Sequence, residues 1–140
     1  MPKRGTFAIK LRKAVPFEFV LDALHSLSPR TNPMFGCLAV YVGKKIVFIL
    51  RDKGGQPDDG VWLATTLAHH ASLRAEFPNM RSIQMFGKAV TGWQVLPVDA
   101  PDFEETALRA CQLIAAGDGR IGKVPKAKRS KKVRKGAQTR

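Results

Sequence analysis

Two adjacent histidines, His69 and His70, are the first residues in the chain that could hold a metal ion. The surrounding residues 67–77 have a helical pattern, and consecutive side chains on a helix point about 100° apart. The two rings would therefore not converge on one ion, and a helical zinc pair uses i, i+4 spacing instead. Because no third ligand is near in sequence, the pattern predicts one surface histidine, one half-buried histidine and no metal site.

Cys37 and Cys111 are the two thiols that could act as nucleophiles. Cys37 alternates with apolar residues along a predicted strand, and Cys111 lies on the apolar stripe of a predicted helix. A thiol in apolar surroundings has a raised pKa and little reactivity. Both cysteines are therefore predicted to be core residues, and two are too few for a disulfide framework.

Two pairs of adjacent carboxylates, Asp58-Asp59 and Glu104-Glu105, could serve acid–base chemistry. The first pair lies in a glycine-rich turn, where aspartate is favoured by local hydrogen bonds. The second lies in the first turns of a predicted helix, where negative charge suits the helix dipole. Glycine-rich phosphate loops are absent. The sequence therefore predicts a protein that is not an enzyme and uses no cofactor.

Positive charge is concentrated at the two ends of the chain. Residues 120–140, called the basic tail below, carry ten basic residues and no acidic one, and residues 1–13 carry five basic residues. Residues 14–119 carry nine basic and eleven acidic residues, within a total net charge of +13. This asymmetry indicates a polyanionic partner, with nucleic acid ahead of an anionic membrane.

The basic tail has two compatible interpretations. Its low hydrophobicity and like charge are typical of a disordered, solubilising extension, and such a tail also binds phosphates by releasing counterions. The predicted phosphate contacts are Lys123, Lys126, Lys128, Arg129, Lys131, Lys132, Arg134 and Lys135. No aromatic residue interleaves them, and Trp62 and Trp93 are predicted to lie in the core, so base stacking is not expected in the tail. Binding should be independent of base sequence, with DNA ahead of RNA.

Hydrophobic periodicity predicts an α+β fold made of one antiparallel sheet of about five strands flanked by helices. Residues 1–15 form a basic arm or strand, residues 16–119 the folded domain, and residues 120–140 the tail. The predicted helices span residues 16–27, 67–77 and 99–116, and the predicted strands span residues 35–42, 45–51, 61–66, 82–86 and 93–98. Gly43 is expected to form the turn of a hairpin, and Pro97 indicates an edge strand.

The two hairpin strands are apolar at nearly every position. This predicts that both faces of the sheet are covered, with helices on at least one. The chain has no apolar run long enough for a signal peptide or a membrane span, so we expect a soluble cytoplasmic protein that does not use the membrane.

The middle of the chain, residues 17–116, resembles the N-terminal domain of the TfoX/Sxy family and, more distantly, YjbR-like proteins. The residues that carry the resemblance are Met34-Phe35-Gly36, Tyr41-Val42, Ile46–Leu50, Val61–Leu63, Leu73–Phe77, Trp93–Pro97 and the helix Asp102–Ile114. The resemblance implies the α+β fold and no catalytic residues, and YjbR-like proteins have been proposed to bind DNA. The chain departs from the family at Cys37 and Ala39, where glycine is more usual, and in having a basic tail in place of a second helical domain. A role in competence is therefore not implied.

The function predicted from the sequence is a non-enzymatic association with nucleic acid through the basic tail. One alternative is a protein-interaction module whose sheet face or edge docks a partner, with the tail only improving solubility. A second alternative is an enzyme of unrecognised type.

Overall fold

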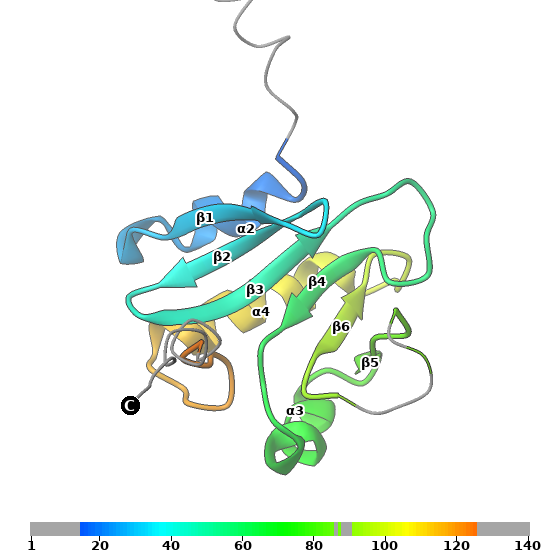
Figure 1. Ribbon diagram of the computed structural model, residues 1–140. Helices are drawn as coiled ribbons and strands as arrows, with labels where there is room; N and C mark the ends of the chain where they lie inside the picture. The colour runs from blue at the N-terminus through cyan, green and yellow to red at the C-terminus, as the bar shows by residue number, and fades with distance from the viewer. Residues whose placement is uncertain (1–14, 86, 88–90, 126–140) are drawn as a thin grey trace, which may run out of the picture.

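A computed structural model describes residues 15–85, 87 and 91–125, and its central feature is an antiparallel sheet of six strands (Figure 1). The strands are arranged in the order β1-β2-β3-β4-β6-β5. They are β1 Arg30–Met34, β2 Cys37–Val42, β3 Lys45–Arg51, β4 Gly60–Leu63, β5 Arg81–Ser82 and β6 Gln94–Pro97. The helices are α2 Glu18–Ala23, α3 His70–Glu76 and α4 Phe103–Ala115, with short 3-10 turns η1 His25–Leu27 and η2 Leu67–His69. The predicted α+β class is confirmed.

The hairpin of β2 and β3 forms as predicted. Gly43 has a φ of 61°, which a glycine adopts without the penalty that a side chain would bring, and the strands pair from Val42↔Lys45 to Leu38↔Leu50. The register shifts between Val40 and Tyr41, so that Val40 pairs with Phe48 and Tyr41 with Ile46. This bulge leaves Val47 as an extra residue on β3 and lets both Val47 and Phe48 face the helices.

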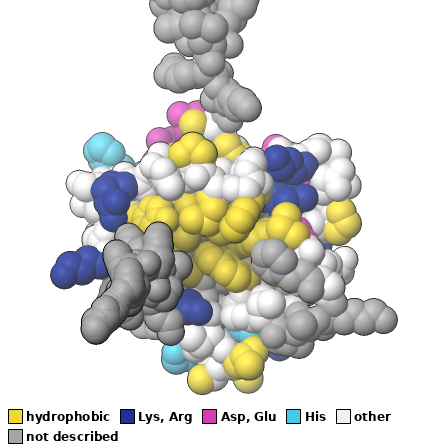
Figure 2. All heavy atoms as spheres, viewed as in Figure 1, with side chains coloured by type: hydrophobic (Ala, Val, Ile, Leu, Met, Phe, Trp, Pro, Cys, Tyr) yellow, Lys and Arg dark blue, Asp and Glu magenta, His cyan; other side chains and the backbone are white. Residues whose placement is uncertain are grey.

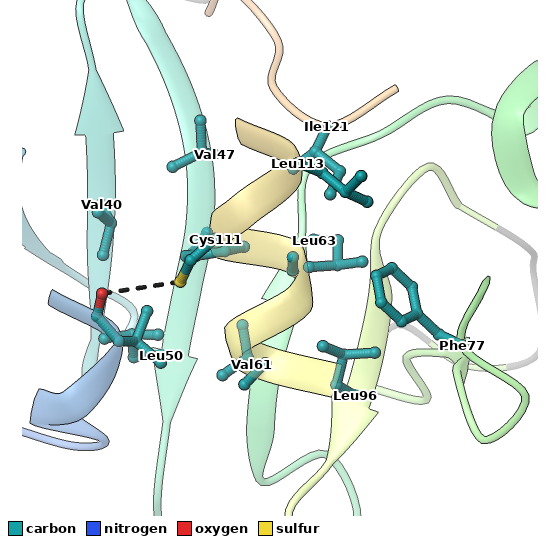
Figure 3. Packing of buried hydrophobic residues seen from close by; sticks show 14 of the residues in the cluster. Val40, Val47, Leu50, Val61, Leu63, Phe77, Leu96, Cys111, Leu113 and Ile121 are labelled. Carbon is teal, nitrogen blue, oxygen red and sulfur yellow. Dashed lines mark hydrogen bonds between the residues drawn. The ribbon is translucent and has the colours of Figure 1, made fainter. Parts of the chain in front are cut away.

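The helices cover one face of the sheet. Side chains of the central strands meet α4 there, and Val20 and Leu24 of α2 complete the cluster (Figure 3). Phe48 is fully buried in this core. The amphipathic pattern predicted for residues 99–116 is correct in its buried face, but α4 begins at Phe103 because residues 99–102 form turns.

Strand β1 was missed by the sequence analysis. Its residues Arg30–Met34 were assigned to a loop, because they contain Pro33 and mainly polar side chains. The strand lies at the edge of the sheet, pairs only with β2 and is mostly exposed, so an apolar pattern is not required.

The predicted edge position of β6 is wrong, since the strand lies between β4 and β5. Pro97 is tolerated because β5 pairs only with Gln94 and Val95. The neighbouring Val98 N–H donates to Asp59 on the β4 side, so the missing N–H of Pro97 faces the side where β5 has already ended.

The hydrogen-bonded body extends past residue 119, where the sequence placed its end. Ile121 is 2% exposed and belongs to the helix-side core. The Gly122 N–H donates to Ala64 O, and Lys123 exchanges two backbone hydrogen bonds with Ile46 of β3. The first residues of the basic tail are therefore fixed to the sheet.

Candidate functional site

The second face of the sheet carries its own apolar cluster. Ala39, Ile49, Trp62 and Val95 form its centre, and among the described residues no helix contributes to it. A groove of about 530 Å³ opens on this face. The residues that line this sheet groove are Met34, Phe35, Tyr41, Ile46, Ile49, Trp62, Trp93, Lys123, Val124 and Pro125. Figure 2 shows hydrophobic side chains gathered across the face, with lysine and arginine side chains at its borders.

Strand register places the apolar lining residues on one side. In a strand, alternate side chains share a face, and directly paired residues on neighbouring strands share it too. Ile49 pairs with Trp62, and Tyr41 pairs with Ile46. Without the bulge, Tyr41 would pair with Val47, so the bulge is what keeps Tyr41 and Ile46 together in the groove.

Phe35 lies at the turn between β1 and β2, and its conformation is costly. Its φ is 54° and that of Gly36 is 75°, as in a type I′ turn, and such a left-handed conformation costs a non-glycine residue about 1–2 kcal/mol. The side chain is also 69% exposed, so burial offsets little of this cost. A strained, exposed aromatic ring beside a groove is typical of a functional position.

Three cations surround the sheet groove, and they are called the rim cations below. The Arg30 guanidinium lies 5.2 Å from the centre of the Tyr41 ring and donates a hydrogen bond to Gly43 O. The Lys53 ammonium donates to Gly36 O at 2.9 Å, beside Phe35. Lys123 is an exposed lining residue. None of the ten described lining residues carries a carboxylate, so the groove is apolar with a positive border.

The two tryptophans differ in exposure. Trp62 is 1% exposed and donates its indole N–H to Asp58 O, as expected of a core residue. Trp93 packs against it at a ring distance of 5.9 Å but is only half-buried. The prediction that both lie in the core is therefore correct for Trp62 and incomplete for Trp93, whose exposed part borders the groove.

Of the predicted phosphate contacts, the structure describes only Lys123. Its backbone is held by Ile46 and its side chain is exposed at the sheet groove. The other seven, Lys126, Lys128, Arg129, Lys131, Lys132, Arg134 and Lys135, lie outside the described residues.

Arg120, the first cation of the basic tail, is engaged in ion pairs. Its guanidinium donates to both carboxylate oxygens of Asp118 and lies 3.8 Å from Glu76. These hydrogen bonds lower the pKa of Asp118 to about 2. Arg120 therefore contributes to the fold, and its charge is largely neutralised within the body.

The remaining candidate chemistry belongs to the fold as well. His70 is buried with Nε2 3.3 Å from Gly92 O, and His69, predicted at the surface, is half-buried. Both cysteines are buried, as predicted, and burial raises the pKa of Cys111 to about 12. Within residues 15–85, 87 and 91–125, no group of three His, Cys, Asp or Glu side chains could hold a metal ion.

The buried carboxylates Asp58 and Asp59 tie loops together. Asp59 accepts hydrogen bonds from three backbone N–H groups of residues 53–56, which agrees with the predicted local bonding. Burial alone would raise the pKa of Asp59, but these bonds and Arg51 outweigh it and lower the pKa. Asp58 instead accepts from the distant Gln84, Met85 and Arg81, which attaches residues 81–85 to the sheet.

Sequence reasoning found Lys123 but missed the aromatic part of the site. Phe35 and Tyr41 looked like interior strand residues because both strands of the hairpin are apolar. The available signal was Phe35-Gly36, an aromatic residue in front of a turn glycine, but a hydrophobic pattern alone does not show which sheet face is left without helices.

No family model, curated protein or solved structure matches the chain. None of the helices in the described part of the chain is long and apolar enough to cross a membrane.

Proposed function

We propose that this protein associates with nucleic acid through phosphate contacts that are independent of base sequence, made mainly by the basic tail. The observation that carries the proposal is the place where the tail leaves the body. Lys123 is bonded to the sheet, and Val124 and Pro125 line the groove beside it. The cations that follow Pro125 thus start from a fixed point next to the rim cations, on one side of the molecule.

The distribution of charge within the body supports the same side. Acidic side chains lie on the helix layer, at Glu18 and Asp22 of α2 and at Glu104 and Glu105 of α4. Other carboxylates, Asp58, Asp59 and Asp118, are neutralised by arginines. A polyanion approaching the sheet side therefore meets positive charge and avoids the exposed carboxylates of the helices.

The resemblance to the TfoX N-terminal domain is a further part of the proposal. It accounts for the combination of an antiparallel sheet with a closing helix, and it assigns no catalytic role to any residue. YjbR-like proteins have been proposed to bind DNA, which is why we name DNA ahead of RNA.

The proposal is tested by measuring the affinity of the full chain for two duplex DNAs of unrelated sequence at low salt. We expect similar affinities for both, because phosphate contacts carry no sequence information. A variant with Lys131, Lys132, Arg134 and Lys135 replaced by glutamine should bind both duplexes more weakly and to the same extent. Unchanged binding by this variant would move the contact into the body, and no binding by either protein would favour the protein-interaction alternative.

A further inference from the structure

Phosphate contacts leave the aromatic side chains of the sheet groove without a role. Phe35 is held at a positive φ with its ring exposed, and Tyr41 and Trp93 are half-buried beside the same groove. A ligand that covered these rings would remove apolar surface from water and would compensate for the strain at Phe35.

Ligand size and charge restrict what this groove can accept. Its volume of about 530 Å³ is typical of sites that bury a small planar group rather than a single ion. The rim cations favour an anionic ligand, and the lining offers flat aromatic faces to an uncharged part of it. A second copy of the chain fits poorly, because two such faces would bring the same cations together.

We infer that the sheet groove binds unpaired nucleobases of a single-stranded nucleic acid, by stacking on Phe35, Tyr41 and Trp93. This inference rests on the proposed function and deepens it. In single-strand-binding proteins, bases stack on aromatic side chains while a positively charged groove follows the backbone. Here Arg30, Lys53 and Lys123 supply the cations around the rings. The bases of a duplex are stacked and paired with each other, so their faces cannot enter the groove.

The two contact regions therefore divide the work. The basic tail binds phosphates of duplex and single strand alike, whereas the sheet groove adds affinity only for a strand with unpaired bases. The chain should bind single strands more tightly than duplexes, and only the excess should depend on the aromatic residues.

Phe35→Asn is the variant that separates binding from folding. Asparagine tolerates a left-handed conformation and is a preferred residue at this position of a type I′ turn, so the substitution removes the ring and relieves the strain. We expect the melting temperature to stay the same or to rise. Leu108→Gln is the matched control, since Leu108 is an exposed apolar residue on α4, in the layer opposite the groove.

The experiment measures the affinity of the full chain and of both variants for oligothymidine, for oligouridine of equal length and for a duplex of equal charge. Phe35→Asn should weaken binding to single strands at least about fivefold, the loss expected when one base loses its stacking partner. Its affinity for the duplex should not change, and Leu108→Gln should bind all three like the parent chain. Comparison of oligothymidine with oligouridine tells whether the strand is DNA or RNA.

Intrinsic fluorescence gives a second readout. The chain contains two tryptophans, and both line the groove, so a base stacked on Trp93 should quench the emission. The duplex should leave the emission unchanged. Quenching by single strands that is lost in Phe35→Asn would support stacking within this one site.

Different failures have different meanings. If the chain binds duplex and single strand equally and Phe35→Asn binds single strands like the parent, stacking in the groove is refuted and the phosphate-contact proposal stands. If the chain binds no nucleic acid at low salt, both proposals fall. If Phe35→Asn instead changes the oligomeric state of the chain, the groove is a contact between protein copies and the inference is wrong.

Discussion

Phe48 is among the largest side chains of the core. It is 0% exposed and pairs across the sheet with Val40 and Leu63, on the face that the helices cover. Phe48→Ala should lower the free energy of unfolding by about 3–5 kcal/mol, because it removes buried apolar surface and leaves a cavity. Denaturant unfolding measures this, with Leu67→Ala at an exposed position as a control that should change stability by less than about 0.5 kcal/mol. A small effect at Phe48 would contradict the packing described for β3.

Asp118 should make the stability of the protein depend on pH in the acidic range. The side-chain hydrogen bonds from Arg120 lower the folded-state pKa of Asp118 from 3.8 to about 2. A lowered pKa means that the ionised carboxylate stabilises the fold, fully above pH 3.8 and progressively less as the pH falls toward 2. Asp118→Asn should therefore be less stable than the parent at neutral pH, and the difference should vanish near pH 2. A difference that persists at pH 2 would mean that the ion pair is not its cause.

Single residues also show where sequence reasoning succeeds. The burial of Cys37, Cys111 and Trp62 follows from apolar neighbours at strand or helix spacing, and it was predicted correctly. The exposure of Phe35 was not predicted. It depends on a two-residue turn between β1 and β2, and β1 itself was hidden by its polar composition.

The segment after α4 behaves as part of the body. Sequence analysis assigned residues 120–140 to a tail because charge dominates them, yet Ile121 is inserted in the core and Lys123 pairs with β3. A chain that ends after Pro125 should melt within a few degrees of the full chain. A chain that ends after Gly119 loses the Ile121 side chain and should be destabilised by about 2–5 kcal/mol, as for other large-to-small losses in a core.

Thermal or denaturant unfolding of the two truncated chains checks this, and Ile121→Ala in the full chain serves as the control for the side chain alone. Equal stability of both truncated chains would show that residues 120–125 add nothing to the fold. In that case the basic tail would not start from a fixed point, and the proposed function would lose its main support.

At the scale of elements, periodicity predicted what burial enforces. Both hairpin strands, β4, β6 and α4 carry apolar residues wherever the fold needs them, and all were found within a few residues. The exposed edge strand β1 has no such requirement, and the position of β6 depends on pairing between distant segments. Local pattern carries little information about either, which is why the strand order and the sheet face without helices had to come from the structure.

The molecule as a whole has two unlike sides. The helix layer carries exposed carboxylates, and the sheet side carries an aromatic groove with cations around it and the start of the basic tail. This polarity, rather than net charge alone, is the reason to expect a polyanion on the sheet side. Net charge could be read from the sequence, but its separation between two layers depends on the fold.

The salt dependence of duplex DNA binding tests the proposed phosphate contacts most directly. If about five phosphates are engaged, the logarithm of the binding constant should fall with the logarithm of salt concentration with a slope of about −4 to −5. Replacing Lys131, Lys132, Arg134 and Lys135 together should flatten the slope by about 3. A slope near zero in the full chain, or equal slopes in the full chain and the variant, would contradict the assignment of these contacts to the basic tail.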